Sequence, residues 1–239
     1  MKAVEKHWHF ATAHYDLATV LDQLGKHDKA ITHYKAAIQL HPTVPEHYNL
    51  GVTLAKKGQI AEAIIQYQNA LKIDPEVYQA HFNLAIIYNN TNQLKQSLYH
   101  FNETLRIKPD FYPALKESGR VSKKMGKIDG AIQCYNQALR IKPNDYEVHY
   151  QLGNLLAHQK KIEQAVHHYI IALKRKPDIK EAHNNLGFLL LKQGNVDKAI
   201  HHFKAALKID PNYAVAHKNL SVAKMKKKEK NEWIYSVPP

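Results

Sequence analysis

Histidine is the residue whose number and spacing in this sequence most suggest chemistry. The chain carries 17 histidines, and six of them recur at regular intervals: His14, His47, His81, His149, His183 and His217. A zinc site gathers three or four ligands within about 2.0–2.1 Å of one ion, whereas stacked helices lie about 10 Å apart. One histidine per repeat is too few for such a site. We therefore expect these rings to pack against the neighbouring helical hairpin and expect no bound metal.

Nucleophiles and phosphate-binding loops are the other sequence features that could support chemistry. The chain has one cysteine, Cys134, and no periodic residue places a base beside it, although a nucleophile needs an adjacent base and an orienting group. The sequence has no P-loop, no GxGxxG motif after a strand and no HExxH motif, and its acidic residues do not recur as a converging pair. We expect no catalytic residue, no cofactor and no enzymatic activity of this chain.

Positive charge gathers at one place in the middle of the chain. The cations are Lys116, Arg120, Lys123 and Lys124. Such a patch suits an acidic side chain or a C-terminal carboxylate, and a solvated run of charge is the alternative. The chain as a whole has a formal charge of +13, which favours acidic partners, nucleic acid included.

The sequence is periodic, so the structural elements that position the histidines and the cations are expected to repeat along the chain. Prolines mark the period: Pro42, Pro75, Pro109, Pro143, Pro177 and Pro211. An aromatic precedes each proline at a fixed distance: Tyr34, Tyr67, Phe101, Tyr135, Tyr169 and Phe203. A residue suited to a left-handed cap lies midway in most units, for example Gly25 or Asn92. Each unit is therefore predicted to be a helix, a short turn and a second helix, which buries its apolar face only by stacking on its neighbours.

The Leu-Gly or Leu-Ala pair of the first helix, the aromatic of the second and the closing proline together resemble the tetratricopeptide repeat family over residues 11–213. The resemblance implies an all-α fold: a right-handed solenoid of six helix-turn-helix repeats plus a C-terminal capping helix, with the first helices lining its concave face. The expected divisions are an N-terminal extension or helix start at 1–10, repeats at 11–43, 44–77, 78–111, 112–145, 146–179 and 180–213, a capping helix at 214–230 and an apolar tail at 231–239.

The inner stripe of the first helices is the expected binding surface, because the fifth, sixth and ninth positions of each unit share one helix face. The residues predicted to bind a peptide there, with Lys123 beside them, are Tyr15, Tyr48, Asn49, Phe82, Asn83, Lys116, Arg120, Lys123, Tyr150, Asn154, Asn185, Phe188 and Asn219. Contacts between neighbouring first helices are the alternative role for the aromatic members of this set.

The sixth positions are polar throughout, and four of them are Asn49, Asn83, Asn185 and Asn219. A side-chain amide donates and accepts, so it can pair with peptide N–H and C=O groups alike. This pattern is similar to the asparagine ladder of the O-linked N-acetylglucosamine transferase family, whose tetratricopeptide domain holds extended peptides. The resemblance implies peptide binding by these four residues more than a role in folding. Hydrogen bonding between neighbouring helices is the alternative, and Asp16, Glu117 and Gln151 depart from the ladder.

We interpret the sequence as a protein–protein interaction scaffold that holds an extended, partly acidic and partly apolar segment of a partner. A substrate-recruiting module of a larger enzyme, such as a glycosyltransferase, and a nucleic-acid-binding protein are the alternatives. With one cysteine, no signal-peptide core and no apolar run of about 18 residues, a soluble cytoplasmic protein is expected. The tail at 231–239 is predicted to dock on its own or a neighbouring solenoid, with disorder as the alternative, and the solenoid ends are candidate self-association surfaces.

Overall fold

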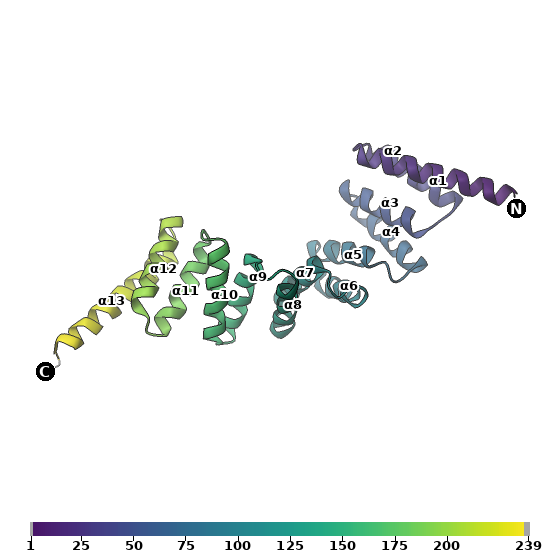
Figure 1. The fold of residues 1–239 in the computed structure, drawn as a ribbon. Helices are drawn as coiled ribbons and strands as arrows, with labels where there is room; N and C mark the ends of the chain where they lie inside the picture. The colour runs from purple at the N-terminus through teal and green to yellow at the C-terminus, as the bar shows by residue number, and fades with distance from the viewer. Residues whose placement is uncertain (1, 237–239) are drawn as a thin grey trace. The chain divides into compact units, whose positions relative to one another are not determined.

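The computed structural model describes residues 2–236 and the side chains of residues 9–229. In this part of the chain every regular element is a helix (Figure 1). The helices are α1 Lys2–Gln23, α2 His27–Leu40, α3 Val44–Lys56, α4 Ile60–Ile73, α5 Tyr78–Asn90, α6 Leu94–Ile107, α7 Tyr112–Lys124, α8 Ile128–Ile141, α9 Tyr146–His158, α10 Ile162–Arg175, α11 Lys180–Lys192, α12 Val196–Ile209 and α13 Ala214–Ser236. The all-α repeat fold expected from the sequence is thus confirmed.

The chain divides into two compact units, Met1–Lys127 and Ile128–Pro239. The first unit holds α1 to α7, in which α1/α2, α3/α4 and α5/α6 are hairpins that pack in succession and α7 packs on α6. The second unit holds α8 to α13, in which α8 packs on α9 and α9/α10 and α11/α12 are hairpins. The boundary between the units falls in the turn between α7 and α8, inside the stretch 112–145 that the sequence treats as the fourth repeat.

The turns between the two helices of each repeat have the left-handed residue that the sequence predicts. Gly25, Gly58, Gly126 and Gly194 have φ between 72° and 78°. Asn92 and Lys160 adopt the same conformation, with φ of 58° and 60°. Lysine has a Cβ that makes this conformation costly, so the turn at Lys160 is held by its hairpin rather than by local preference.

The core of each hairpin is an aromatic ring of the second helix laid against a small residue of the first. Tyr169 is 1% exposed, and a Cβ built on Gly153 would lie 2.9 Å from two of its ring carbons. The pair Gly187 and Phe203 repeats this arrangement, with a closest approach of 2.8 Å. The small residues predicted at fixed positions are therefore required for the close approach of the two helices.

The two ends of the chain extend the helical pattern. Helix α1 begins at Lys2, so the stretch expected as an extension or helix start is helical from that residue. Helix α13 continues to Ser236, beyond residue 230, where the capping helix was expected to end. The side chains of the predicted docking tail 231–239 lie outside the described residues, and its docking stays a prediction. No described helix is long and apolar enough to cross a lipid bilayer.

Candidate functional site

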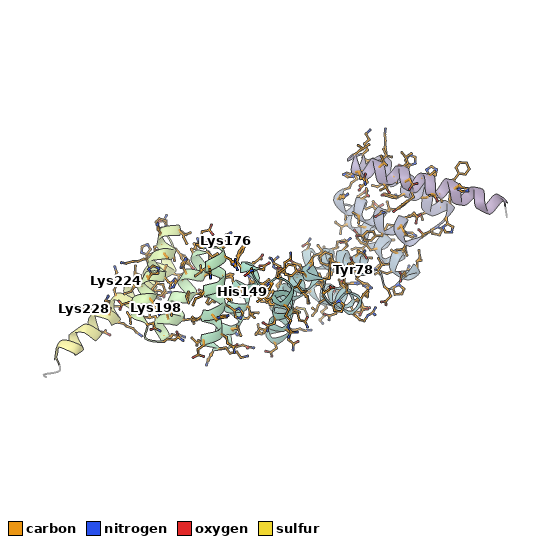
Figure 2. All side chains as sticks on the ribbon, in the orientation of Figure 1. Tyr78, His149, Lys176, Lys198, Lys224 and Lys228 are labelled. Carbon is orange, nitrogen blue, oxygen red and sulfur yellow. The ribbon has the colours of Figure 1, made fainter. Side chains whose placement is uncertain are left out.

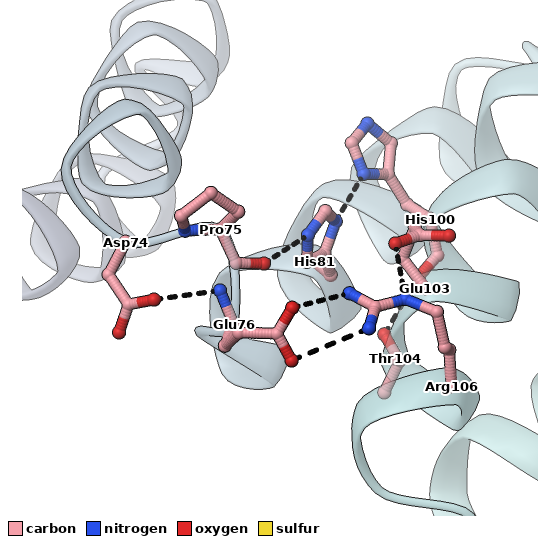
Figure 3. A network of polar contacts seen from close by, with 8 residues as sticks. All are labelled: Asp74, Pro75, Glu76, His81, His100, Glu103, Thr104 and Arg106. Carbon is pink, nitrogen blue, oxygen red and sulfur yellow. Dashed lines mark hydrogen bonds and ion pairs between the residues drawn. The ribbon is translucent and has the colours of Figure 1, made fainter.

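The recurring histidines are hydrogen-bonded within the repeats. His81 lies with its Nδ1 atom 2.9 Å from Nδ1 of His100 and its Nε2 atom 3.2 Å from the carbonyl oxygen of Pro75 (Figure 3). The carbonyl can only accept, so Nε2 of His81 carries the proton, and its Nδ1 accepts from Nδ1–H of His100. His81 thus links the second helix of its own repeat to the proline turn of the preceding one, and His149 and His183 make the same two contacts.

The same pairing recurs along the chain. The Nδ1–Nδ1 distances are 2.8 Å for His14 with His33, 2.8 Å for His149 with His168 and 2.9 Å for His183 with His202. In the second repeat His47 pairs instead with Oε1 of Gln66 at 2.8 Å. The prediction that these histidines serve packing is confirmed, although their partner is the second helix of their own hairpin as well as the neighbouring one.

Burial disfavours the charged form of the second-helix ring in three of these pairs. It lowers the pKa of His100, His168 and His202 to about 4, and the facing histidine of each pair lowers the pKa further. The pKa of His81 and of His183 is lowered as well, again chiefly by burial. The described side chains contain no cluster of three or more metal-ligating groups. The histidines are structural links in this fold.

The four predicted cations of α7 are only partly available to bind an acidic ligand. Arg120 Nη1 lies 3.0 Å from Oε1 of Glu117, one turn away on the same helix. Lys124 Nζ donates to Oδ1 of Asn89 at 2.9 Å. The four predicted cations do share one helix, but at least one of them is neutralised by a neighbouring carboxylate, which weakens the attraction for an acidic ligand.

Four aromatic residues of the inner stripe, each predicted to bind a peptide, pack against the buried ring on the second helix of their own repeat. Tyr15 lies 6.0 Å from Tyr34 between ring centroids, and Tyr48 lies 5.9 Å from Tyr67. Phe82 with Phe101 and Tyr150 with Tyr169 repeat this contact at 5.9 and 6.2 Å. All four rings are half-buried, so each contributes to packing and still presents one side to solvent.

The asparagine ladder of the first unit makes contacts between repeats. Asn49 Nδ2 donates to the hydroxyl of Tyr15 at 2.9 Å. Asn83 Nδ2 donates to the hydroxyls of Tyr48 and Tyr67 at 3.4 and 3.3 Å. The amide nitrogens thus link each repeat to the one before it, while the amide oxygens of both asparagines accept no hydrogen bond from the described residues. Each ladder amide therefore has an acceptor to offer to a ligand.

In the second unit the ladder forms a small network. Asn154 Oδ1 accepts from the hydroxyl of Tyr169 at 2.7 Å and from Nδ2 of Asn185 at 3.1 Å. Asn219 Nδ2 donates to Oδ1 of Asn184 at 2.9 Å. The Asn154 amide nitrogen donates to no described group, so this side chain keeps its donor for a ligand.

A cavity of about 270 Å³ opens beside this network. It brings together three of the predicted residues, Asn154, Asn185 and Phe188. Its other lining residues are Ala157, Lys160, Ile162, Tyr169, Leu189 and Lys192. Tyr150 and Asn219, which were also predicted to bind a peptide, do not line this cavity. The predicted residues of the first unit are distributed over several repeats of that unit.

The cavity is lined by both apolar and cationic side chains. Phe188 is 42% exposed, and Lys192 Nζ lies 4.7 Å from the centre of its ring. Lys160 and Lys192 form no ion pair with a described carboxylate. The repeat pattern of the sequence does not point to these lysines or to Ile162, because they come from a turn and from helix ends rather than from the inner stripe. The one signal in the sequence is Lys160 itself, which stands where the other units have Gly or Asn.

Comparison with known proteins agrees with this architecture. Models of the tetratricopeptide repeat match residues 11–44, 51–92, 119–160, 146–179 and 181–213. No curated protein sequence matches the chain.

Solved structures share the fold at low sequence identity. The C-terminal part of a TPR repeat-containing protein from Cytophaga hutchinsonii is 19% identical over 92% of this chain and 93% of that one, with a TM-score of 0.73. YrrB, described as a TPR protein with an unusual peptide-binding site, is 21% identical over 77% of this chain and 96% of its own, with a TM-score of 0.71. Pseudomonas aeruginosa pilF is 17% identical over 89% of this chain and 97% of its own, with a TM-score of 0.66.

Proposed function

The chain belongs to the tetratricopeptide repeat family, and we propose that it is a non-enzymatic interaction scaffold that binds an extended peptide segment of a partner protein. The observation that carries this proposal is the cavity of the second unit, where Asn154, Asn185 and Phe188 come together. A likeness in fold to YrrB, which has an unusual peptide-binding site, is consistent with it.

The chemistry of the cavity indicates which peptide it would take. Phe188, Ile162 and Leu189 offer apolar surface to one side chain of about the size of leucine. Lys160 and Lys192 offer positive charge without a carboxylate of their own, so an acidic side chain next to the apolar one is favoured. The partner segment is therefore extended, with an apolar residue adjacent to Asp or Glu.

The amides would hold the backbone of this segment. Asn154 has an unused N–H donor for a peptide carbonyl, and its oxygen is already fixed by Tyr169 and Asn185. Because two hydrogen bonds fix the orientation of this side chain, little rotamer entropy is lost when a peptide binds. The remaining predicted residues of the first unit extend the same type of surface, and we propose them as a second, independent contact region.

Selection from a displayed library of random dodecapeptides tests this function, because it requires no candidate partner. The wild-type chain is compared with Phe188→Ala, which removes the exposed ring of the cavity, and with Ile170→Ala. Ile170 is 51% exposed and lies on α10, outside the cavity lining, so it is the matched control.

The wild-type and Ile170→Ala chains should enrich the same peptides, in which an apolar residue neighbours an acidic one, and Phe188→Ala should not. If no peptide is enriched by the wild-type chain, or if Phe188→Ala enriches the same set, the proposed site is wrong. Circular dichroism of each variant establishes that its helices are intact.

A further inference from the structure

Two junctions of the first unit pair a lysine with an oxygen acceptor at the ends of successive first helices. In both, the thirteenth residue of one repeat donates to the twelfth residue of the repeat before it. Lys56 Nζ lies 2.6 Å from Oδ2 of Asp22, between α3 and α1. Lys124 Nζ donates to Oδ1 of Asn89 at 2.9 Å, between α7 and α5. Each of these lysines therefore finds its acceptor inside the chain.

The junction between α9 and α11 has the lysine without the acceptor. The thirteenth residue of the repeat 180–213 is Lys192, and the twelfth residue of the repeat before it is Ala157. Both residues line the cavity of the second unit. The methyl group of alanine accepts no hydrogen bond, and Lys192 Nζ lies instead 4.7 Å from the centre of the Phe188 ring. The ammonium group of Lys192 has no hydrogen-bond acceptor among the described residues.

A second difference adds positive charge to the same junction. Lys160, in the turn after α9, stands where the other five repeats have Gly or Asn, and it also lines the cavity. Its left-handed conformation, with φ of 60°, is unfavourable for a residue with a Cβ, so folding alone would favour glycine there. Compared with the junction between α1 and α3, which has Asp22 and Gly25 at these two positions, the cavity lacks a carboxylate and has an additional cation.

We propose that Ala157 determines the ligand specificity of this cavity, because it leaves Lys192 and Lys160 to bind a carboxylate of the partner peptide. An Asp or Glu side chain of the peptide takes the place that the carboxylate of Asp22 has between α1 and α3. An acceptor supplied by the chain itself at position 157 would close this subsite. The role of Ala157 rests on the proposed peptide binding, within which it assigns the residue that sets the preference for an acidic segment.

The surroundings of Lys192 favour a side-chain carboxylate over other anions. The ring of Phe188 and the side chain of Leu189 place apolar surface in the same cavity. A doubly charged phosphate loses more hydration on such a surface than a singly charged carboxylate, because the cost of removing an ion from water grows with its charge. A side chain also reaches the lysines while the peptide backbone continues past Asn154, whereas a chain terminus would end there.

The preference for an acidic peptide over its amide counterpart tests this role of Ala157. A peptide from the library selection, made with an amidated C-terminus, is compared with the same peptide in which Asn or Gln replaces each Asp or Glu. By fluorescence anisotropy the wild-type chain should bind the acidic form about fivefold more tightly, the upper range for an ion pair in contact with solvent. Ala157→Asp should bind the two forms about equally, because its own carboxylate pairs with Lys192.

Two control variants separate this effect from changes in shape and in net charge. Ala157→Leu introduces the same branched shape without an oxygen, and Ile170→Asp adds the same charge on α10, outside the cavity lining. Both should keep the wild-type preference, even where the larger side chain weakens both peptides. An unchanged preference in Ala157→Asp overturns the proposal. A peptide whose affinity depends on Phe188 but not on its acidic residue contradicts the role of Ala157 and leaves the peptide site intact, whereas a wild-type chain that binds no peptide contradicts the proposed function itself.

A double-mutant cycle tests the same geometry without any peptide. Ala157→Asp should fold, because Asp22 has the equivalent place in α1, and circular dichroism establishes this. At neutral pH and low salt, Lys192→Met should lower the denaturation midpoint of the Ala157→Asp chain more than that of the wild type, because only the former contains the ion pair. Equal shifts in the two chains would mean that Lys192 does not reach position 157, and would overturn the proposal whatever the peptide measurements show.

Discussion

The Nδ1 atoms of His149 and His168 lie 2.8 Å apart, and Nε2 of His149 lies 2.9 Å from the carbonyl oxygen of Pro143. One proton therefore lies between the two rings, and it comes from His168. A proton added to Nδ1 of His149 would remove the acceptor of this hydrogen bond. The pairs in the third and sixth repeats have the same arrangement, so several junctions of the fold depend on neutral histidine.

Acidification should destabilise the fold between about pH 6.5 and pH 4. The pKa of His168 and His202 is about 4 in the folded chain and about 6.5 when unfolded, so the unfolded state binds more protons in this window. Stability is therefore complete above about pH 6.5, falls as the pH is lowered, and levels off below about pH 4. We expect a loss of about 1–2 kcal/mol per pair, allowing for the partial solvent contact of the rings.

The variant His168→Gln with His202→Gln provides the comparison, because the second repeat already uses a His47–Gln66 pair. Chemical denaturation at pH 7.5 and pH 5.0 should show a smaller loss of unfolding free energy for this variant than for the wild type. The titratable side chains that face the replaced rings, His149, His167, His183 and His201, are the same in both chains. Equal losses would mean that the pairs do not carry the pH dependence.

Replacing Gly153 by Ala should destabilise the second unit by about 1–3 kcal/mol, because the new methyl group would lie 2.9 Å from the buried ring of Tyr169. The displaced ring also lines the cavity, so peptide affinity should fall in the same variant. Ala85→Gly is the reverse change at the equivalent position opposite Phe101 and should cost only about 1 kcal/mol of helix propensity. Thermal denaturation and peptide binding measure both effects; a fully stable Gly153→Ala chain would contradict the close packing.

The ladder asparagines should contribute to stability as well as to binding. The sequence alone predicts that Asn49→Ala and Asn83→Ala leave the melting temperature almost unchanged. The hydrogen bonds to Tyr15, Tyr48 and Tyr67 predict instead a loss of about 0.5–1.5 kcal/mol for each variant. Denaturant titration of the two single variants decides between these expectations, and unchanged midpoints would favour a role in binding alone.

Local stability should be lower in α7 than in α11. Ser118 and Ser122 of α7 are buried at 1% and 3% exposure, where α11 has Leu186 and Leu190. Each Leu-to-Ser difference removes about 2 kcal/mol of apolar burial, and repeat arrays can open locally. Amide hydrogen exchange should be faster in residues 112–124 than in residues 180–192. Equal protection of the two helices would show that burial of these serines has little effect.

The helices, their turns and the aromatic core could be predicted from the sequence, because each depends on residues at a fixed spacing within one repeat. The left-handed conformation at Asn92 and the small residue opposite Tyr169 are of this kind. The histidine pairs could not be foreseen, since the partner lies on another helix and its side-chain orientation is set by packing. The cavity could be predicted only in part, because Lys160 comes from a turn and Ile162 and Lys192 come from the ends of two helices.

The affinity of one selected dodecapeptide for a set of matched variants tests the central claim, peptide binding in the cavity of the second unit, most directly. By fluorescence anisotropy, Phe188→Ala and Lys192→Glu should each weaken binding about tenfold or more, which corresponds to about 1.4 kcal/mol. The controls Ile170→Ala and Lys198→Glu, which change exposed residues outside the cavity (Lys198 is labelled in Figure 2), should bind within about twofold of the wild type. Unchanged affinity in folded Phe188→Ala and Lys192→Glu chains would contradict the assignment of the peptide to this cavity.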